Sequence, residues 1–389
     1  MDRTEIESLR LGEKNILLFI RNVLIKTSVL FLAINLFFAL CYPMQILGKI
    51  SLYNRIFPGR NRLPYGEIPE KAYNLSIYNI EAMFASHEIS AKSKPSDEYR
   101  VILIGDSSTW GFLLEPHQTL DAILNLEENV TPDGRKMSVY NLGYPVMSLT
   151  KDLLILSYAL EYEPDLIIWL FTLESFPYDK QLFPPIIQNN PQQVKTLVEQ
   201  YQLNINPASD QFIQPSFLKQ TIVGSRRDLA DMMRLQIYGV MWTATGIDQY
   251  IPQDYTKPME DLPEDDSFHN LKPPSLYPTD LALDILEAGM TMTKDIPVLF
   301  VNEPMFISQG ENSQIRYNFY YPRWAYDDYR KILEIESSMN NWNYLDAWDI
   351  ISASEFSNSA VHLSPKGAQQ FAQLIREEIY NLLKGKPTN

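Results

Sequence analysis

An uncharged stretch near the N-terminus restricts the fold of this chain more than any other feature. From Thr27 to Leu47 the sequence contains no Asp, Glu, Lys or Arg. A helix of this length is long enough to cross the hydrocarbon core of a bilayer, which is about 30 Å thick. We therefore expect residues 1–48 to form a lead and a single transmembrane anchor, with membrane contact through residues 27–47.

Two other interpretations of this stretch are less favourable. A cleaved signal peptide is disfavoured because the polar lead is long and no small-x-small site follows the apolar run. Lipid modification of Cys41 is disfavoured by the bulky Leu40 before it. The segment Leu17–Ile25 either extends the helix or lies along the membrane interface.

The orientation of the anchor follows from weak signals. Basic residues on its two sides are nearly balanced, so the positive-inside rule decides little. Because only one span is predicted and the lead before it is much shorter than the domain after it, we expect the N-terminus inside and the large domain outside, which makes the main domain extracytoplasmic.

Composition excludes several classes of function. The formal net charge is −15 and no Lys/Arg cluster is present, so we expect no nucleic-acid partner. The single cysteine cannot form a disulfide framework or a cysteine-based zinc site. The four histidines lack metal-ligand spacing, and no Gly-rich phosphate loop occurs. We therefore expect no metal and no cofactor; protein partners are not indicated.

The region after residue 97 alternates between short apolar runs and helix-length stretches. Such alternation predicts an α/β fold with a parallel sheet covered on both faces. The predicted strands are 101–106, 138–143, 165–172, 296–303 and 344–350. The predicted helices are 149–160, 325–338 and 365–383.

Two segments interrupt this pattern. Residues 49–97 are mixed and polar, and we expect a stalk with one short helix at Tyr78–Ser86. Residues 177–280 are dense in Pro, Asn, Gln and Asp, which predicts an insertion that folds over one edge of the sheet as a cap. The α/β domain itself is expected to occupy residues 98–385.

Three motifs place polar groups where a parallel sheet binds ligands. Ser107 lies in the turn Gly105-Asp106-Ser107-Ser108-Thr109-Trp110-Gly111, directly after the first strand. His362 lies in His362-Leu363-Ser364-Pro365-Lys366-Gly367, just before the last helix. Gly143 lies in Tyr140-Asn141-Leu142-Gly143-Tyr144-Pro145, after the second strand. Each motif also has a purely structural interpretation, as a capped turn, a helix N-terminus and a tight turn, respectively.

Taken together, the three motifs resemble the conserved blocks of the SGNH/GDSL hydrolase family. The resemblance covers about residues 98–176 and 290–385. It implies a three-layer flavodoxin-like sheet, Ser107 as the nucleophile and His362 as its base. It also implies that the backbone N–H groups of Gly143 and Ser107 bind the oxyanion.

The sequence departs from the family pattern at two positions. Glu174 stands near the position where the family has an oxyanion-binding Asn, and an ionised carboxylate cannot donate a hydrogen bond. Thr172 or Ser175 could replace that donor. Ser359 stands where the family has the Asp that orients the histidine, and neither Asp346 nor Asp349 has matching spacing. The departures fit either a modified enzyme or a degenerate member that binds without turnover.

The end of the fourth predicted strand supplies one more candidate. Glu303 follows that strand and is expected to line the cleft, as is Glu174. The aromatic run 318–327 with Arg323 either stacks on or binds a sugar-like or anionic substrate or, as we favour, packs in the core, with Arg323 paired to an acidic neighbour.

These observations predict a membrane-anchored serine esterase or O-acyltransferase. Its substrate would be an ester-bearing envelope glycan or lipid, and the reaction would pass through an acyl-Ser107 intermediate. The alternative is a catalytically degenerate accessory or carbohydrate-binding protein of the cell envelope. A lipase acting on bilayer lipids is a third possibility, which needs an apolar channel from the cap to the membrane.

Overall fold

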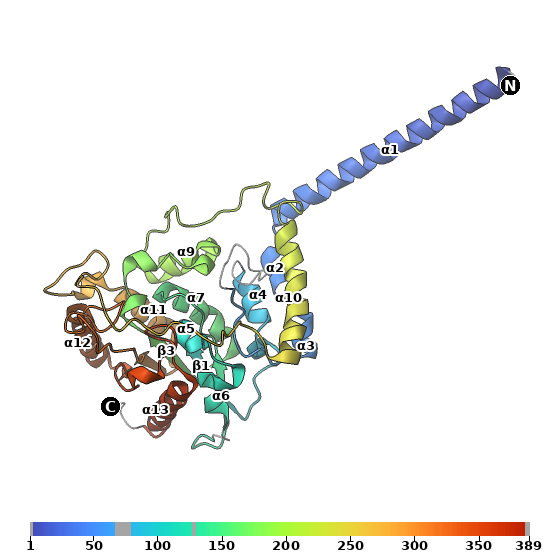
Figure 1. Ribbon diagram of the computed structural model, residues 1–389. Coiled ribbons are helices and arrows are strands. Elements are labelled where there is room, and N and C mark those ends of the chain that lie inside the picture. The colour runs from blue at the N-terminus through green and yellow to red at the C-terminus, as the bar shows by residue number, and fades with distance from the viewer. Residues whose placement is uncertain (1–2, 67–78, 127–129, 386–389) are drawn as a thin grey trace.

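The computed structural model describes residues 3–66, 79–126 and 130–385 (Figure 1). Its centre is a sheet of five parallel strands in the order β2-β1-β3-β4-β5. The strands are β1 (Glu98–Ile104), β2 (Lys136–Asn141), β3 (Leu166–Phe171), β4 (Val298–Asn302) and β5 (Asn343–Asp346). This is the flavodoxin-like strand order. The prediction of an α/β fold with these five strands is confirmed.

Helices cover both faces of the sheet. One face carries α7 (Leu149–Ala159), α11 (Leu283–Thr293) and α12 (Arg323–Asn340), and the other carries α6 (Leu120–Asn125) and α13 (Pro365–Leu383). Alternate residues of one strand enter different cores: Ile102 packs with α7, whereas Val101 packs with α13. Because both faces are buried, the central strands β3 and β4 are almost entirely apolar, whereas β1, β2 and β5 also contain polar or charged residues.

Local sequence signals fix where the predicted helices begin. Ser148 caps α7 by accepting a hydrogen bond from the Lys151 N–H. Ser364 caps α13 by accepting from the Gly367 N–H, and Pro365 occupies the first helical position. The three long helices predicted for the α/β domain are therefore present, with small shifts at their ends.

The N-terminal apolar region differs in detail from the prediction. Helix α1 (Arg3–Cys41) starts well before Thr27, and its stretch Lys14–Cys41 is long and apolar enough to cross a membrane. Tyr42 has a positive φ and precedes Pro43, so the helix ends there and not at Leu47. The last residues of the predicted span form a separate short helix, α2 (Met44–Gly48).

The described part of the predicted stalk does not stand apart from the domain, because Ile80 and Phe84 belong to the same core as α7 and the Arg62 guanidinium donates to the Gly111 and Leu114 carbonyls. The Tyr53 hydroxyl in α3 (Leu52–Ile56) donates to the Ser86 carbonyl, and Asn54 bonds backbone carbonyls after α4 (Ile80–Ala85). The predicted short helix is α4; its predicted first residue, Tyr78, lies outside the described residues. Buried polar anchors of this kind leave no hydrophobic signal in the sequence.

The segment 177–280 contains α8 (Pro185–Gln188), α9 (Pro191–Tyr201) and α10 (Arg226–Thr245). Helix α10 packs on α3 at the edge of the molecule, away from the sheet (Figure 1). The chain then returns toward the carboxyl ends of the strands, where the Gln249 amide donates to the carbonyls of Gly111 and Leu114. Lys257 likewise donates to the Phe356 carbonyl.

Candidate active site

Ser107 is held in a strand-to-helix turn that the local sequence dictates. Strand β1 ends at Ile104, and a Cβ on Gly105 would lie 2.2 Å from Thr109 Oγ1, so only glycine fits there. Asp106 caps the short helix α5 (Ser107–Trp110) by accepting from the Ser108 N–H at 2.8 Å. Gly111, at φ +86°, ends that helix. Ser107 is thus the first helical residue at the carboxyl edge of the sheet.

His362 lies in a closed loop between β5 and α13. The His362 carbonyl accepts hydrogen bonds from the backbone N–H and the hydroxyl of Ser357. The Phe306 N–H donates to the Ala360 carbonyl, which ties the same loop to the end of β4. The ring of Phe112 packs against the imidazole with centroids 4.9 Å apart. The histidine is therefore fixed both by its backbone and by its ring.

The structure brings Ser107 and His362 together. Ser107 Oγ lies 2.8 Å from His362 Nε2, although the two residues are 255 positions apart. His362 Nδ1 lies 2.7 Å from Asn358 Oδ1. With the amide oxygen facing the ring, Nδ1 carries the proton and Nε2 is free to accept one from the serine hydroxyl.

Asn358 was not among the residues singled out from the sequence. The family pattern places the orienting carboxylate at position 359, whereas in this fold the residue at 358 makes the contact. Ser359 does not contact the imidazole through any hydrogen bond described here, and Asp346 bonds Asn302 and Arg330 instead. A polar residue four positions before His362 was the available signal.

Burial sets the protonation state of the imidazole. Desolvation lowers the pKa of His362 from 6.5 to about 4. Asn358 is neutral, so it can orient the ring but adds no charge that would favour the imidazolium. His362 is therefore neutral at physiological pH, which is the state a general base requires.

Backbone geometry near Ser107 supplies one candidate oxyanion donor. As the first residue of α5, Ser107 has a backbone N–H that the helix leaves unpaired. The Gly143 N–H, in contrast, already donates to Asn141 Oδ1 at 3.0 Å. A Cβ on Gly143 would lie 2.6 Å from the Trp110 backbone nitrogen, so this glycine permits close packing against α5. An oxyanion role for Gly143 would require its N–H to leave Asn141.

Glu174 follows β3, as predicted, but it is almost entirely buried within a charged cluster of the insertion. Its carboxylate lies 2.9 Å from Lys180 Nζ and 3.2 Å from His269 Nε2. The hydrogen bond to Glu174 raises the pKa of His269. The Thr172 hydroxyl, proposed as a replacement donor, is buried and hydrogen-bonded to the Tyr321 hydroxyl at 2.6 Å. It is therefore not free to bind an oxyanion.

Glu303 does not line an open cleft, contrary to the prediction. Its side chain is fully buried beneath α5, where Oε1 accepts a hydrogen bond from Thr109 Oγ1 at 3.0 Å. Burial raises the pKa of Glu303 well above its usual range, and the nearby Asp106 raises it further. The buried Lys151 donates to the Gly105 and Tyr144 carbonyls at 2.7 Å. Glu303 and Lys151 thus hold the turn that carries Ser107 from its buried side.

Most of the aromatic run 318–327 packs in the core, as we favoured, but Phe319 is exposed. Tyr321 and Tyr326 are fully buried, with ring centroids 4.9 Å apart. The Arg323 guanidinium lies over the Tyr317 ring at 4.1 Å and donates to the Ser313 carbonyl. Its partners are thus a ring and a carbonyl, in place of the acidic neighbour that we predicted.

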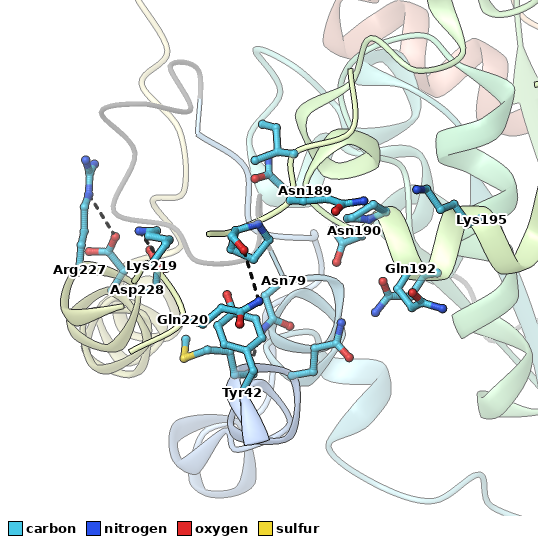
Figure 2. A pocket seen from close by; sticks show the side chains of 18 residues that line it. Tyr42, Asn79, Asn189, Asn190, Gln192, Lys195, Lys219, Gln220, Arg227 and Asp228 are labelled. Carbon is cyan, nitrogen blue, oxygen red and sulfur yellow. Dashed lines mark hydrogen bonds and ion pairs between the residues drawn. The ribbon is translucent and has the colours of Figure 1, made fainter. Parts of the chain in front are cut away.

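A polar cavity of about 660 Å³ lies elsewhere, between the end of α1, α9 and α10 (Figure 2). Amide side chains such as Asn79 and Asn190 line it together with Tyr42, Lys195 and Asp228. Neither Ser107 nor His362 contributes to its wall. No sequence motif pointed to this cavity.

Comparisons with known proteins find only distant structural similarity. No family profile matches the sequence, and no curated protein matches it. Solved structures that resemble the chain include a carbohydrate acetylesterase family member from Sinorhizobium meliloti, with a TM-score of 0.32 and 11% identity over 74% of this chain and 99% of that one. An aryl esterase from M. smegmatis gives a TM-score of 0.32 and 12% identity over 73% and 99% of the two chains. A GDSL-like lipase from Bacteroides thetaiotaomicron gives a TM-score of 0.32 and 11% identity over 76% of this chain and 95% of the lipase chain. The fold assignment rests on the strand order and not on these matches.

Proposed function

We propose that this chain is a membrane-anchored serine esterase or O-acyltransferase of the SGNH/GDSL type. The observation that carries the proposal is the chain of contacts from Ser107 Oγ to His362 Nε2 and from His362 Nδ1 to Asn358. A serine hydroxyl becomes a useful nucleophile when a neutral, oriented imidazole accepts its proton.

The proposed reaction proceeds in two steps. In the first, Ser107 Oγ attacks the ester carbonyl carbon while its proton passes to His362 Nε2. The tetrahedral oxyanion accepts a hydrogen bond from the Ser107 N–H, and its collapse expels the alcohol, which takes the proton from His362. In the second, water or an acceptor hydroxyl gives its proton to His362 and attacks the acyl-Ser107 ester. Collapse of this second intermediate releases the acid or the new ester, and the proton returns from His362 Nε2 to Ser107 Oγ, which restores the serine.

The substrate that we propose is an ester-bearing glycan or lipid of the cell envelope. Helix α1 supports this choice, because a stretch of 28 residues that can cross a bilayer would hold the domain at a membrane surface. We further propose that the large domain lies outside the cytoplasm.

One observation favours a second candidate, a non-catalytic envelope protein. Glu174 is engaged in ion pairs where an oxyanion donor is expected, and the Gly143 N–H is bound to Asn141. With a single oxyanion donor, a rate loss on the order of a hundredfold or more relative to a complete site is expected. Such a site could bind an ester without turning it over.

Ester hydrolysis by the purified full chain in detergent separates these candidates. Aryl acetate and an acetylated sugar serve as substrates, and acyl transfer is followed by adding a sugar acceptor. We expect Ser107→Ala to lose activity, whereas Ser108→Ala, which alters the neighbouring hydroxyl in the same turn, keeps most of it. Equal turnover by the wild-type chain and Ser107→Ala would contradict the catalytic role.

The topology can be tested with one introduced cysteine. In a Cys41→Ser background, Met339→Cys places a thiol on the exposed surface of α12. If the domain is extracytoplasmic, a membrane-impermeant maleimide should label this thiol in intact spheroplasts. Labelling only after lysis would indicate the opposite orientation.

A further inference from the structure

Helix α10 is attached to the molecule by one face only. The Gln236 side chain accepts from the Leu52 N–H at 2.8 Å and donates to the Ile50 carbonyl at 3.2 Å. A Cβ on Gly239 would lie 2.3 Å from the Tyr53 ring, so the two helices touch closely at this point. These contacts fix which face of α10 points away from the domain.

The opposite face of α10 is exposed and apolar. Between residues 233 and 244 the exposed residues are apolar or aromatic, and the partly exposed Arg234 is paired with Asp231; these exposed residues are Met233, Ile237, Tyr238, Val240, Met241 and Ala244. Their spacing of three to four residues places most of them along one stripe of the helix. Side chains of this size are seldom left exposed in a continuous stripe unless the surface binds something.

The neighbouring segment extends this surface. Exposed apolar side chains of α2, of α3 and of the residues just after each helix belong to the segment that packs on α10: Ile46, Ile50, Leu52, Ile56 and Phe57. Exposed basic residues, Lys49 and Arg55, are interspersed among them, although the whole chain has a net charge of −15. We call the exposed residues 46–57 and 233–244 together the α3–α10 face.

The α3–α10 face is continuous with the apolar helix α1. Asn35 of α1 accepts a hydrogen bond from the Val223 N–H just before α10. Phe38 of α1 and Met232 of α10 pack around the same small core as Met44 of α2. In Figure 1, α1 leaves the molecule on the side where α3 and α10 form the outermost layer, and α12 lies at the other end.

From this continuity we propose that the α3–α10 face lies on the bilayer that α1 crosses, with its apolar side chains in the interface. This inference rests on the membrane anchoring proposed above. The partner is a lipid surface containing anionic phospholipid, since apolar side chains with basic residues among them bind such surfaces. The contact would hold the α/β domain in one orientation to the membrane.

Fluorescence quenching by lipids tests this proposal in the full chain. The Cys41→Ser protein is labelled with an environment-sensitive fluorophore at Met233→Cys or Ile237→Cys. Matched controls are Met339→Cys and Ile335→Cys on α12, because Met233 and Met339 are 71% and 72% exposed and Ile237 and Ile335 are 59% and 55% exposed. Leu32→Cys in α1 reports on the anchor. Vesicles of phosphatidylethanolamine and phosphatidylglycerol carry brominated acyl chains.

We expect strong loss of fluorescence at positions 233 and 237 and at position 32, with none at 335 or 339. Quenching at position 32 without quenching at 233 and 237 would overturn the surface contact while leaving the anchor intact. Absence of quenching at position 32 would instead contradict the anchoring itself, and the surface proposal with it. The cysteines at 233 and 237 can also be tested for reaction with a water-soluble maleimide. If they are protected from it in native membranes but not in lipid vesicles, the face binds a protein partner and the lipid proposal is overturned.

Discussion

Replacing Asn358 with Asp should move the acid limb of Ser107 reactivity toward neutral pH. The pKa of His362 falls from 6.5 to about 4 because the ring is desolvated beside a neutral amide. This difference disfavours the imidazolium by on the order of 3 kcal/mol. Since the base works only when it is neutral, the wild-type protein should stay reactive as the pH falls until it approaches that lowered pKa.

In Asn358→Asp a carboxylate would stand where the amide oxygen now lies, 2.7 Å from Nδ1. An opposite charge at this distance raises a histidine pKa by about 1–3 units. The pH at which reactivity is half lost should rise by the same amount, while the reactivity at higher pH stays unchanged. Asn358→Ala removes the orienting contact without adding charge. Its acid limb should therefore stay at the same low pH, while the rate on the plateau at higher pH falls by up to roughly a hundredfold.

The assay is the rate of covalent labelling by a fluorophosphonate, measured between acid and neutral pH. Asn340→Asp, which adds the same charge on the exposed end of α12, is the control and should match the wild type. A wild-type limb near 6.5, or an unchanged limb in Asn358→Asp, would refute the assignment of His362 as a buried neutral base oriented by Asn358.

Three further predictions concern the support of the site. Asp248→Ala should reduce the free energy of unfolding by about 3–5 kcal/mol in chemical denaturation, because it leaves the fully buried Arg62 guanidinium, now 2.7 Å from that carboxylate, without its counter-charge. Lys151→Met should destabilise the chain similarly and slow fluorophosphonate labelling, since Lys151 Nζ holds the Gly105 carbonyl beside the nucleophile; an unchanged labelling rate would refute its supporting role. Gly143→Ala should reduce stability by about 1–3 kcal/mol and displace α5, because the added Cβ would meet the Trp110 backbone; unaltered unfolding and labelling would contradict that contact.

The strands and main helices could be predicted from the sequence because their signals are local. Leu166–Phe171 is an unbroken apolar run, which suits a strand that is buried on both faces. Ser364-Pro365 marks the start of α13 by its capping chemistry alone. Such patterns need no knowledge of the partner elements.

The parts that were missed depend on contacts between distant residues. Glu303 was expected in the cleft because it follows β4, but Thr109, 194 positions away, holds it beneath α5. The docking of α10 on α3 depends on Gln236 meeting the backbone at Leu52, 184 positions away. Asn358 was overlooked because an amide, one position from the expected carboxylate, orients His362. None of these pairings has a periodicity that a sequence displays.

The most direct test of the site is the mass of the intact full chain after exposure to a fluorophosphonate, followed by mapping of the modified residue. We expect one adduct, located on Ser107, present in the wild type and in Ser108→Ala, absent in Ser107→Ala and formed far more slowly in His362→Ala. A wild-type chain that stays unmodified, or a Ser107→Ala chain that gains the same adduct, would contradict the account of Ser107 as a nucleophile activated by His362.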